Sequence, residues 1–257
     1  MLSNILAISS IILILLFAYL KKQLTLVATI TAFLVGIILY FCGGWLLLTA
    51  LYTFFVSAVI ASNIKKSYKK KTISGIHEKT GKRDFVQVIA NSLIAVILAI
   101  VYFITKEQIL LIAVLIAFAC YNADSWASEL GIISKKNPRF ILGFKKAQKG
   151  VSGAVTLLGI VYSILGSLII AILYFLFKGE NIYLVILISL YGFLGAIMDS
   201  VLGQVFQALY YDEENKKYTE KKDGNKKVKG YSIINNDTVN FLAPLISVTI
   251  YILISLF

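Results

Sequence analysis

An apolar run of helix length ends, from Tyr121 on, in the polar residues YNADSWASELG. Residues four apart share a helix face, so Asp124 pairs with Ser128 and Ser125 pairs with Glu129. About half of the helix circumference is therefore polar at this end. Charged groups inside a membrane protein are costly and mark functional positions, and such a surface does not face lipid.

Polar side chains at helical spacing recur in three other apolar segments. The stripes are Arg83, Gln87 and Asn91; Asp199, Gly203 and Gln207; and Asn236 with Asn240. Interhelical hydrogen bonds alone would explain the amides and hydroxyls, including those of Asn91, Ser128 and Asn240. They do not explain Asp124 and Asp199, because a neutral Asn would join helices without the cost of a charge.

The depth of the charged residues indicates that they lie together. With a rise of 1.5 Å per residue, Asp124 lies about 24 Å, and Asp199 about 27 Å, from the outer end of its own apolar run. Two further carboxylates begin apolar runs on the same side. We therefore expect one layer of carboxylates near the cytoplasmic rim, formed by Asp84, Asp124, Glu129, Asp199 and Asp237.

Carboxylate oxygens that converge in one place suit a hard divalent cation, and Mg²⁺ usually takes one or two carboxylates together with substrate phosphates. The segment KKAQKGVSG at 145–153 combines lysines with glycines at the start of an apolar run. A helix start offers backbone N–H groups and a positive dipole end to an anion, although small residues there also serve ordinary packing. His77, the single histidine, lies in a polar loop, so a histidine-based zinc site or Ser-His pair is not indicated.

Composition places these residues in a membrane protein. Hydrophobic residues make up 59% of the chain, and the mean hydropathy is +0.84. Runs of about 20 apolar residues span a bilayer, and they predict one all-α integral membrane domain over 1–257 with about eight spans, or seven if the first three divide differently. The expected spans are 3–20, 24–41, 44–62, 84–104, 108–131, 151–177, 181–209 and 236–256.

Charge predicts the orientation. Of the 25 Lys and Arg residues, 23 lie in connections on one side, and only Lys106 and Lys178 lie on the other. Basic connections stay in the cytoplasm, so both termini are expected outside and the carboxylate layer inside, at the plasma membrane in a prokaryote. The net charge of +12 at this face can also attract anionic lipid or a phosphorylated ligand. The charged segment 209–235 is expected to be a solvated loop, with a hairpin around its Asp-Gly pair as the alternative.

Five segments occur in the order seen in one integral membrane family: RDFVQVIAN from Arg83, ADSWASELG from Ala123, KGVSGAVTLLG from Lys149, GFLGAIMDSVLGQVFQ from Gly192 and NNDTVNFLAP from Asn235. The chain resembles the family that contains transmembrane protein 19 and the chloroplast phytyl-phosphate kinase of tocopherol synthesis. The resemblance covers 83–257, and the helices of 1–62 match less well. The family commonly has a Gly-Thr-Asn-Gly-Gly-Val-Ser-like start to the sixth span, whereas this chain reads AQKGVS at 147–152.

The resemblance implies a kinase that uses CTP and Mg²⁺ to convert an isoprenoid monophosphate, of the phytyl or geranylgeranyl type, to the diphosphate. Membrane lipid, nucleotide and isoprenoid phosphate are then the partners, and no nucleic acid is expected. An acceptor that carries a phosphate is itself the nucleophile, so no strong base is needed. The expected roles are metal binding and catalysis by Asp124, Glu129 and Asp199; phosphate binding by Arg83, Lys149, Gly150, Ser152 and Gly153; and substrate orientation by Gln87, Asn91, Ser125, Ser128, Gln207, Asn236, Asp237 and Asn240.

A transporter or flippase of a lipid phosphate or another anion is the alternative. It would place substrate groups near the bilayer midplane on interrupted helices, and it would often show internal repeats. The two halves of this sequence show no convincing repeat, and the carboxylates are expected at one rim. Both observations favour an enzyme that meets a water-soluble nucleotide.

Overall fold

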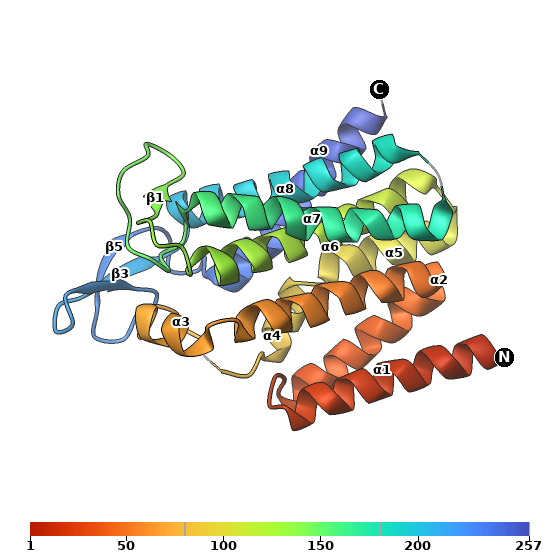
Figure 1. The fold of residues 1–257 in the computed structure, drawn as a ribbon, viewed down its shortest axis with the longest axis horizontal. Helices are drawn as coiled ribbons and strands as arrows, with labels where there is room; N and C mark the ends of the chain where they lie inside the picture. Colours follow the sequence, from red (N-terminus) through yellow and green to blue (C-terminus); the bar gives the residue numbers. More distant parts are fainter. Residues whose placement is uncertain (80, 180, 257) are drawn as a thin grey trace.

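The computed structural model describes residues 1–79, 81–179 and 181–256, and it is a bundle of membrane-length helices (Figure 1). Six helices in these ranges are long and apolar enough to cross a bilayer, which confirms the prediction of a polytopic all-α membrane protein. They are α1 (Leu2–Leu20), α2 (Leu26–Asn63), α6 (Gln108–Gly131), α7 (Leu157–Lys178), α8 (Ile182–Val205) and α9 (Asn236–Ser255).

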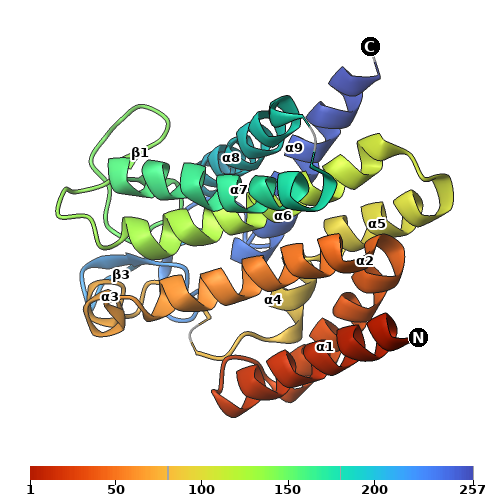
Figure 2. The same cartoon turned by 45° about the vertical axis from the view of Figure 1, so that its right-hand side comes forward.

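Helix α2 supplies two of the expected spans, because it bends sharply at Gly44 (Figure 2). The φ of Gly44 is 65° and its ψ is −152°, a backbone conformation that is open to glycine and strained for other residues. The two arms of α2 lie on either side of this bend and correspond to the expected spans 24–41 and 44–62.

The expected single span over 84–104 is wrong, because it consists of the short helix α4 (Phe85–Ala90) and the helix α5 (Leu93–Thr105). Two side chains donate hydrogen bonds to backbone carbonyl oxygens at the end of α4. Asn91 Nδ2 donates to Gln87 O at 2.8 Å, and Ser92 Oγ donates to Val88 O at 2.7 Å. Such side-chain bonds compete with the helical pattern.

Helix α6 is the centre of the bundle, and every residue from Leu111 to Ala123 is buried. Glycines let the neighbouring helices approach its backbone closely. A Cβ atom on Gly166 of α7 would lie 2.9 Å from Asn122 O, and one on Gly195 of α8 would overlap Cys120 Sγ. Small residues at helix contacts are how membrane helices gain packing without a hydrophobic driving force.

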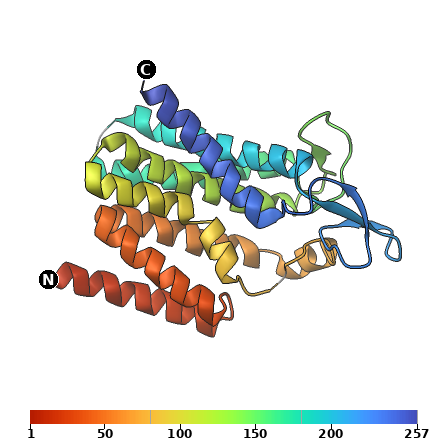
Figure 3. The same ribbon diagram turned by 180° about the vertical axis from the view of Figure 1, so that it is seen from behind.

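One end of the bundle carries the polar connections, and both chain termini lie away from it (Figures 1 and 3). The helix α3 (Lys66–Thr72) lies there, and strands β1 (Arg139–Phe140) and β2 (Ala154–Val155) form an antiparallel pair. The segment 209–235, expected to be a loop, folds into β3 (Leu209–Asp212), β4 (Lys217–Thr219) and β5 (Lys226–Lys229). The order is β4-β3-β5, so β4 and β5 each pair with β3, and the alternative hairpin between them is also wrong.

Replacing Gly192 with Ala should test the packing on α6. The new Cβ would lie 2.5 Å from Ala119 Cβ and 2.8 Å from Ser167 Cβ, so α8 must move away. We expect a loss of about 1–3 kcal/mol of stability, measured as a lower thermal unfolding temperature in detergent. Gly36→Ala is the control, because its Cβ would meet Ile11 at an ordinary 3.4 Å. Equal unfolding temperatures for both variants would contradict the close approach.

Candidate functional site

A cavity of about 420 Å³ opens among the loops and helix ends at the polar end of the bundle. Residues of α4, α6, α7, α8 and α9 and of the connections before α4 and α7 line it, and residues of α1 and α2 extend the lining. Every residue proposed for the site from the sequence, except Gln207, is in this lining: Arg83, Gln87, Asn91, Asp124, Ser125, Ser128, Glu129, Lys149, Gly150, Ser152, Gly153, Asp199, Asn236, Asp237 and Asn240.

Asp124 of α6 and Asp199 of α8 form a carboxylate pair that lines the cavity together. Among the residues that the structure describes, neither has an ion-pair partner. With its amide turned to satisfy its neighbours, Asn240 donates to Asp199 Oδ2 at 3.2 Å and accepts from Asn236 at 3.2 Å. Two carboxylates this close repel each other unless a proton or a cation lies between them.

A second, small cavity of about 10 Å³ lies against the same pair. Its polar lining comes from Asn91, Tyr121, Asp124, Asp199 and Asn240. The Tyr121 hydroxyl is buried without a hydrogen-bond partner among the described residues. The volume is close to that needed for one water molecule. The oxygen-rich surroundings and the unpaired carboxylates therefore fit a small hard cation or a water.

Glu129 does not join this pair, so the expected three-carboxylate metal site is wrong. Its Oε2 lies 2.6 Å from Lys69 Nζ. Lys69 is only 4% exposed and also donates to Ala61 O. Among the described residues, no three His, Cys, Asp or Glu side chains lie close enough to hold one metal ion. A cation at Asp124 and Asp199 would have to complete its coordination with other oxygens, as Mg²⁺ does with substrate phosphates.

Arg83 offers a positive charge to the cavity. Its backbone is fixed beside the start of α2, since Arg83 N donates to Gln23 O at 2.9 Å and Arg83 O accepts from Thr25 N at 3.1 Å. Its guanidinium has no ion-pair partner in the described part of the chain, although Glu129 acts on it through charge. A guanidinium binds phosphate oxygens through two parallel hydrogen bonds.

Lys149 lines the cavity, but its ammonium group is bonded within the protein. Its ammonium group donates to the carbonyl oxygens of Ser134 and Ile132 and to the Tyr68 hydroxyl. These carbonyls follow the C-terminal end of α6, where a cation is stabilised by the helix dipole. Lys149 is thus engaged within the protein itself, and the expectation that its charge faces a phosphate is not supported.

The glycines of this segment do not begin a helix either. Helix α7 begins at Leu157, because the Thr156 side chain accepts from Gly159 N and caps it. Gly150 and Gly153 instead lie in turns with φ values of 84° and 81°. A Cβ atom on Gly153 would lie 2.8 Å from Ser200 O, so this glycine allows the turn to pack on α8 beside Asp199.

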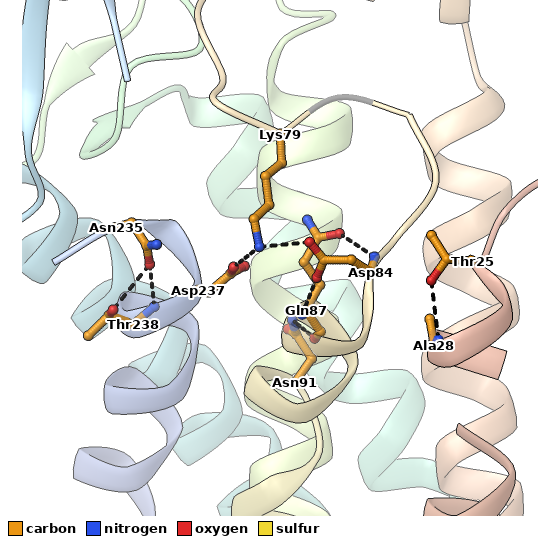
Figure 4. Close-up of polar contacts among 9 residues, drawn as sticks. All are labelled: Thr25, Ala28, Lys79, Asp84, Gln87, Asn91, Asn235, Asp237 and Thr238. Atoms are coloured by element: carbon orange, nitrogen blue, oxygen red, sulfur yellow. Dashed lines mark hydrogen bonds and ion pairs between the residues drawn. The ribbon is translucent and has the colours of Figure 1, made fainter. Parts of the chain in front are cut away.

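Lys79 joins the starts of two helices at the rim (Figure 4). Its Nζ lies 2.9 Å from Asp84 Oδ2 at the N-cap of α4 and 2.5 Å from Asp237 Oδ2 in the first turn of α9. Asp84 also forms a capping box with Gln87, whose Oε1 accepts from Asp84 N. Lys79 therefore neutralises Asp84 and Asp237. The side-chain oxygen of Gln87 is engaged in the cap of α4.

Ser125 and Ser128 face the cavity from α6 beside Glu129. The Ser128 hydroxyl donates to Ser125 O at 3.2 Å, so its proton is satisfied within the helix. Asn236 lies one turn from Asn240 on α9 and shares its amide contacts. These side chains line the same cavity as the carboxylate pair.

Glu220 is a cavity residue that the sequence did not indicate. It lies between β4 and β5, and its side chain is only 7% exposed. Its Oε1 accepts from Gln207 Nε2 at 2.9 Å and from Ser152 Oγ at 3.3 Å, and its Oε2 lies 3.3 Å from His77 Nδ1. Helix α8 ends at Val205, so Gln207 lies beyond the expected stripe and holds Glu220 in place.

His77 is therefore a rim residue with a carboxylate partner. Burial lowers the pKa of its imidazole, but the hydrogen bond to Glu220 and the charges of Glu220 and Glu129 outweigh burial, so this pKa lies above its usual value. The His77–Glu220 pair makes its full contribution to the free energy of unfolding at pH values below about 6.5, the pKa of histidine in the unfolded chain. That contribution is lost as pH rises through the folded pKa.

Lys69→Met should lower the free energy of unfolding by about 1–3 kcal/mol, because it leaves Glu129 partly buried without its cation. The loss should appear as a lower unfolding temperature in detergent. The double variant Lys69→Met with Glu129→Gln should recover most of it, since no charge is left unpaired. Failure of the second change to restore stability would show that Lys69 acts through packing alone.

His77 is the single histidine of the chain, so its titration can be followed without assignment by NMR of histidine-labelled protein. We expect a pKa above that of a model histidine, and a lower value in Glu220→Gln. Glu214→Gln, in the exposed turn between β3 and β4, is the control and should leave the titration unchanged. A pKa equal in the Glu220→Gln variant and the wild type would contradict the pairing.

Comparison with known proteins places this geometry in a family. The family model described as "Integral membrane protein DUF92" matches residues 9–248. Protein PGR of Arabidopsis thaliana is 28% identical over 256 residues, covering 90% of this chain and 88% of its own. An uncharacterized membrane protein of Methanocaldococcus jannaschii is 31% identical over 218 residues, covering 85% and 79%.

A further uncharacterized membrane protein, from Synechocystis sp., is 28% identical over 192 residues and covers 73% of each chain. No solved structure matches the chain. The family match begins at residue 9, so it includes the first helices as well as the segments that carry the sequence motifs. The family indicated by those motifs is confirmed, and the chain belongs to the DUF92 family of integral membrane proteins.

Proposed function

We propose that this protein is a membrane-embedded kinase that transfers a phosphoryl group from a nucleotide, CTP, to an isoprenoid monophosphate of the phytyl or geranylgeranyl type. The observation that carries the proposal is one cavity that combines an unpaired carboxylate pair, Asp124 and Asp199, with the available guanidinium of Arg83. Phosphoryl transfer asks a protein mainly for positioning and charge neutralisation, which these groups can supply.

The reaction balances without a further reagent. A phosphate oxygen of the acceptor forms a new bond to the γ-phosphorus of CTP, and the bond from that phosphorus to the β–γ bridging oxygen breaks. CDP leaves with the bridging oxygen, and the product is the isoprenoid diphosphate. Because the attacking oxygen is already anionic, no side chain has to remove a proton.

Each group has a role in this proposal. Asp124 and Asp199 would hold Mg²⁺, which would neutralise charge on the nucleotide phosphates when bound. Arg83 would bind the phosphate oxygens, and Asn91 and Asn240 would orient the two substrates beside the carboxylates. The lysine-rich end of the bundle would face the cytoplasm, where a soluble nucleotide is available, while the acceptor arrives from the membrane.

Asp124→Asn and Asp199→Asn should each reduce the rate of transfer at least about 100-fold. The measurement is formation of labelled isoprenoid diphosphate from radiolabelled CTP by purified protein with Mg²⁺. Glu214→Gln is the matched acid-to-amide control outside the cavity and should keep the wild-type rate. Transfer that persists in both aspartate variants, or absence of transfer with all four nucleotides in folded wild-type protein, would refute the proposal.

Transport of a lipid phosphate or another anion is a second candidate, and the break between α4 and α5 favours it. Interrupted helices that line a cavity are typical of transporters, and the break places Asn91 and Ser92 in the cavity lining. Flux of a fluorescent lipid phosphate in proteoliposomes, without nucleotide, separates the two functions. Flux without phosphoryl transfer would favour the transporter.

A further inference from the structure

The cavity extends beyond its polar rim into a second, apolar half. Ile11 and Leu15 of α1 and Val35, Tyr52 and Phe55 of α2 line this half. The same cavity thus has carboxylates and a guanidinium at one end and aliphatic and aromatic side chains at the other. A ligand that fills it must be an amphiphile with an anionic head and an apolar tail.

The apolar half reaches about the middle of a bilayer. With a rise of 1.5 Å per residue, Ile11 lies about 14 Å from the polar end of α1, and Val35 lies about 14 Å from the start of α2. Tyr52 lies about 17 Å from the polar end of α2. The hydrocarbon core is about 30 Å thick, so these three residues lie near its midplane.

A hydrogen bond joins α1 to α2 at this depth. The Tyr52 hydroxyl lies 2.8 Å from Ser10 Oγ, next to Ile11. Ile11 also belongs to a small buried cluster with Ala7, Tyr40 and Leu48. Ile11 and Tyr52 line the cavity, whereas Ser10, Ala7 and Tyr40 do not, so the apolar half ends at the level of the Ser10–Tyr52 bond.

The residues that line the apolar half belong to different hydrophobic clusters. The main core of the bundle includes Val35 and Phe54 of α2. The clusters between α1 and α2 are small, and α1 lies at the edge of the bundle (Figures 1 and 3). Aliphatic walls that no side chain fills lose dispersion contacts, and an apolar chain would restore them.

We infer that this apolar half holds the tail of the acceptor and limits its length at the closure formed by Ser10 and Tyr52, with Val35 and Tyr52 as the residues that select tail length. The inference rests on the proposed function only for the identity of the head group. Each methylene that the cavity buries should raise affinity about fourfold. Methylenes beyond the closure should add nothing.

The test is binding, without nucleotide, of a series of n-alkyl monophosphates of increasing chain length to purified protein in nanodiscs. Wild-type affinity should rise with length and then level off. Val35→Phe should move the plateau to shorter chains and weaken the binding of the longest chains at least about tenfold. Tyr52→Ala should move the plateau to longer chains.

Two variants are matched controls. Leu34→Phe adds the same ring at a 55% exposed position on the neighbouring face of α2, and it should leave the length profile unchanged. Tyr52→Phe removes the hydrogen bond to Ser10 and keeps the ring, so it should keep a plateau near that of the wild type. A thermal unfolding transition, measured for each protein in nanodiscs without ligand, reports that the wild type and each variant are folded.

The outcomes separate the two proposals. Alkyl phosphates that bind with the same length profile in the wild type, Val35→Phe and Tyr52→Ala would overturn the tail assignment and leave the kinase proposal intact. A profile that moves as expected, in protein that transfers no phosphate, would support the tail site and refute the kinase. Binding of no alkyl phosphate of any length to folded protein would overturn the assignment of the cavity to such a ligand.

Discussion

Two carboxylates that face each other inside a membrane bundle are the constraint on which the rest of the structure depends. Asp124 and Asp199 come from two membrane-length helices, and no described lysine or arginine forms an ion pair with them. Helix α6 can carry its aspartate at this place because glycines of α7 and α8 let the three backbones approach closely. The position of the carboxylates in the bundle thus depends on the small residues at the contacts between α6, α7 and α8.

At the polar end of the bundle, most of the other charged side chains near the cavity are bonded to one another or to the backbone. Lys69 neutralises Glu129, Lys79 neutralises Asp84 and Asp237, and Lys149 satisfies carbonyls after α6. These lysines hold the loops and helix ends against each other around the cavity. Arg83 is the cation in the lining whose guanidinium stays available, and a guanidinium suits phosphate better than an ammonium does.

The sequence predicted the helical class, and the polar residues that it singled out at helical spacing, Asp124 and Asp199 among them, lie with one exception in the lining of one cavity, because hydrophobic run length and helical spacing are local properties. It did not predict that Glu129 is taken by Lys69, 60 residues away, or that Glu220 reaches the cavity, because such pairings depend on how distant connections fold together. For a related reason the sequence predicts the start of the 151–177 span too early and does not predict the break after α4. Hydrogen bonds from the backbone to Thr156, and from Asn91 and Ser92 to the backbone, set where α7 begins and where α4 ends. A hydropathy pattern does not contain this information.

Helix α4 is only six residues long, with the Asp84 cap at one end and the break at Asn91 at the other. Gln87 and Asn91 are on this piece, and Arg83 immediately precedes it. The start of this piece is held in place, because Arg83 is bonded through its backbone to Gln23 and Thr25, and Lys79 bridges Asp84 to Asp237. The position of both amides relative to the carboxylate pair is therefore set by the direction of this one short helix, which starts from a fixed point at Arg83.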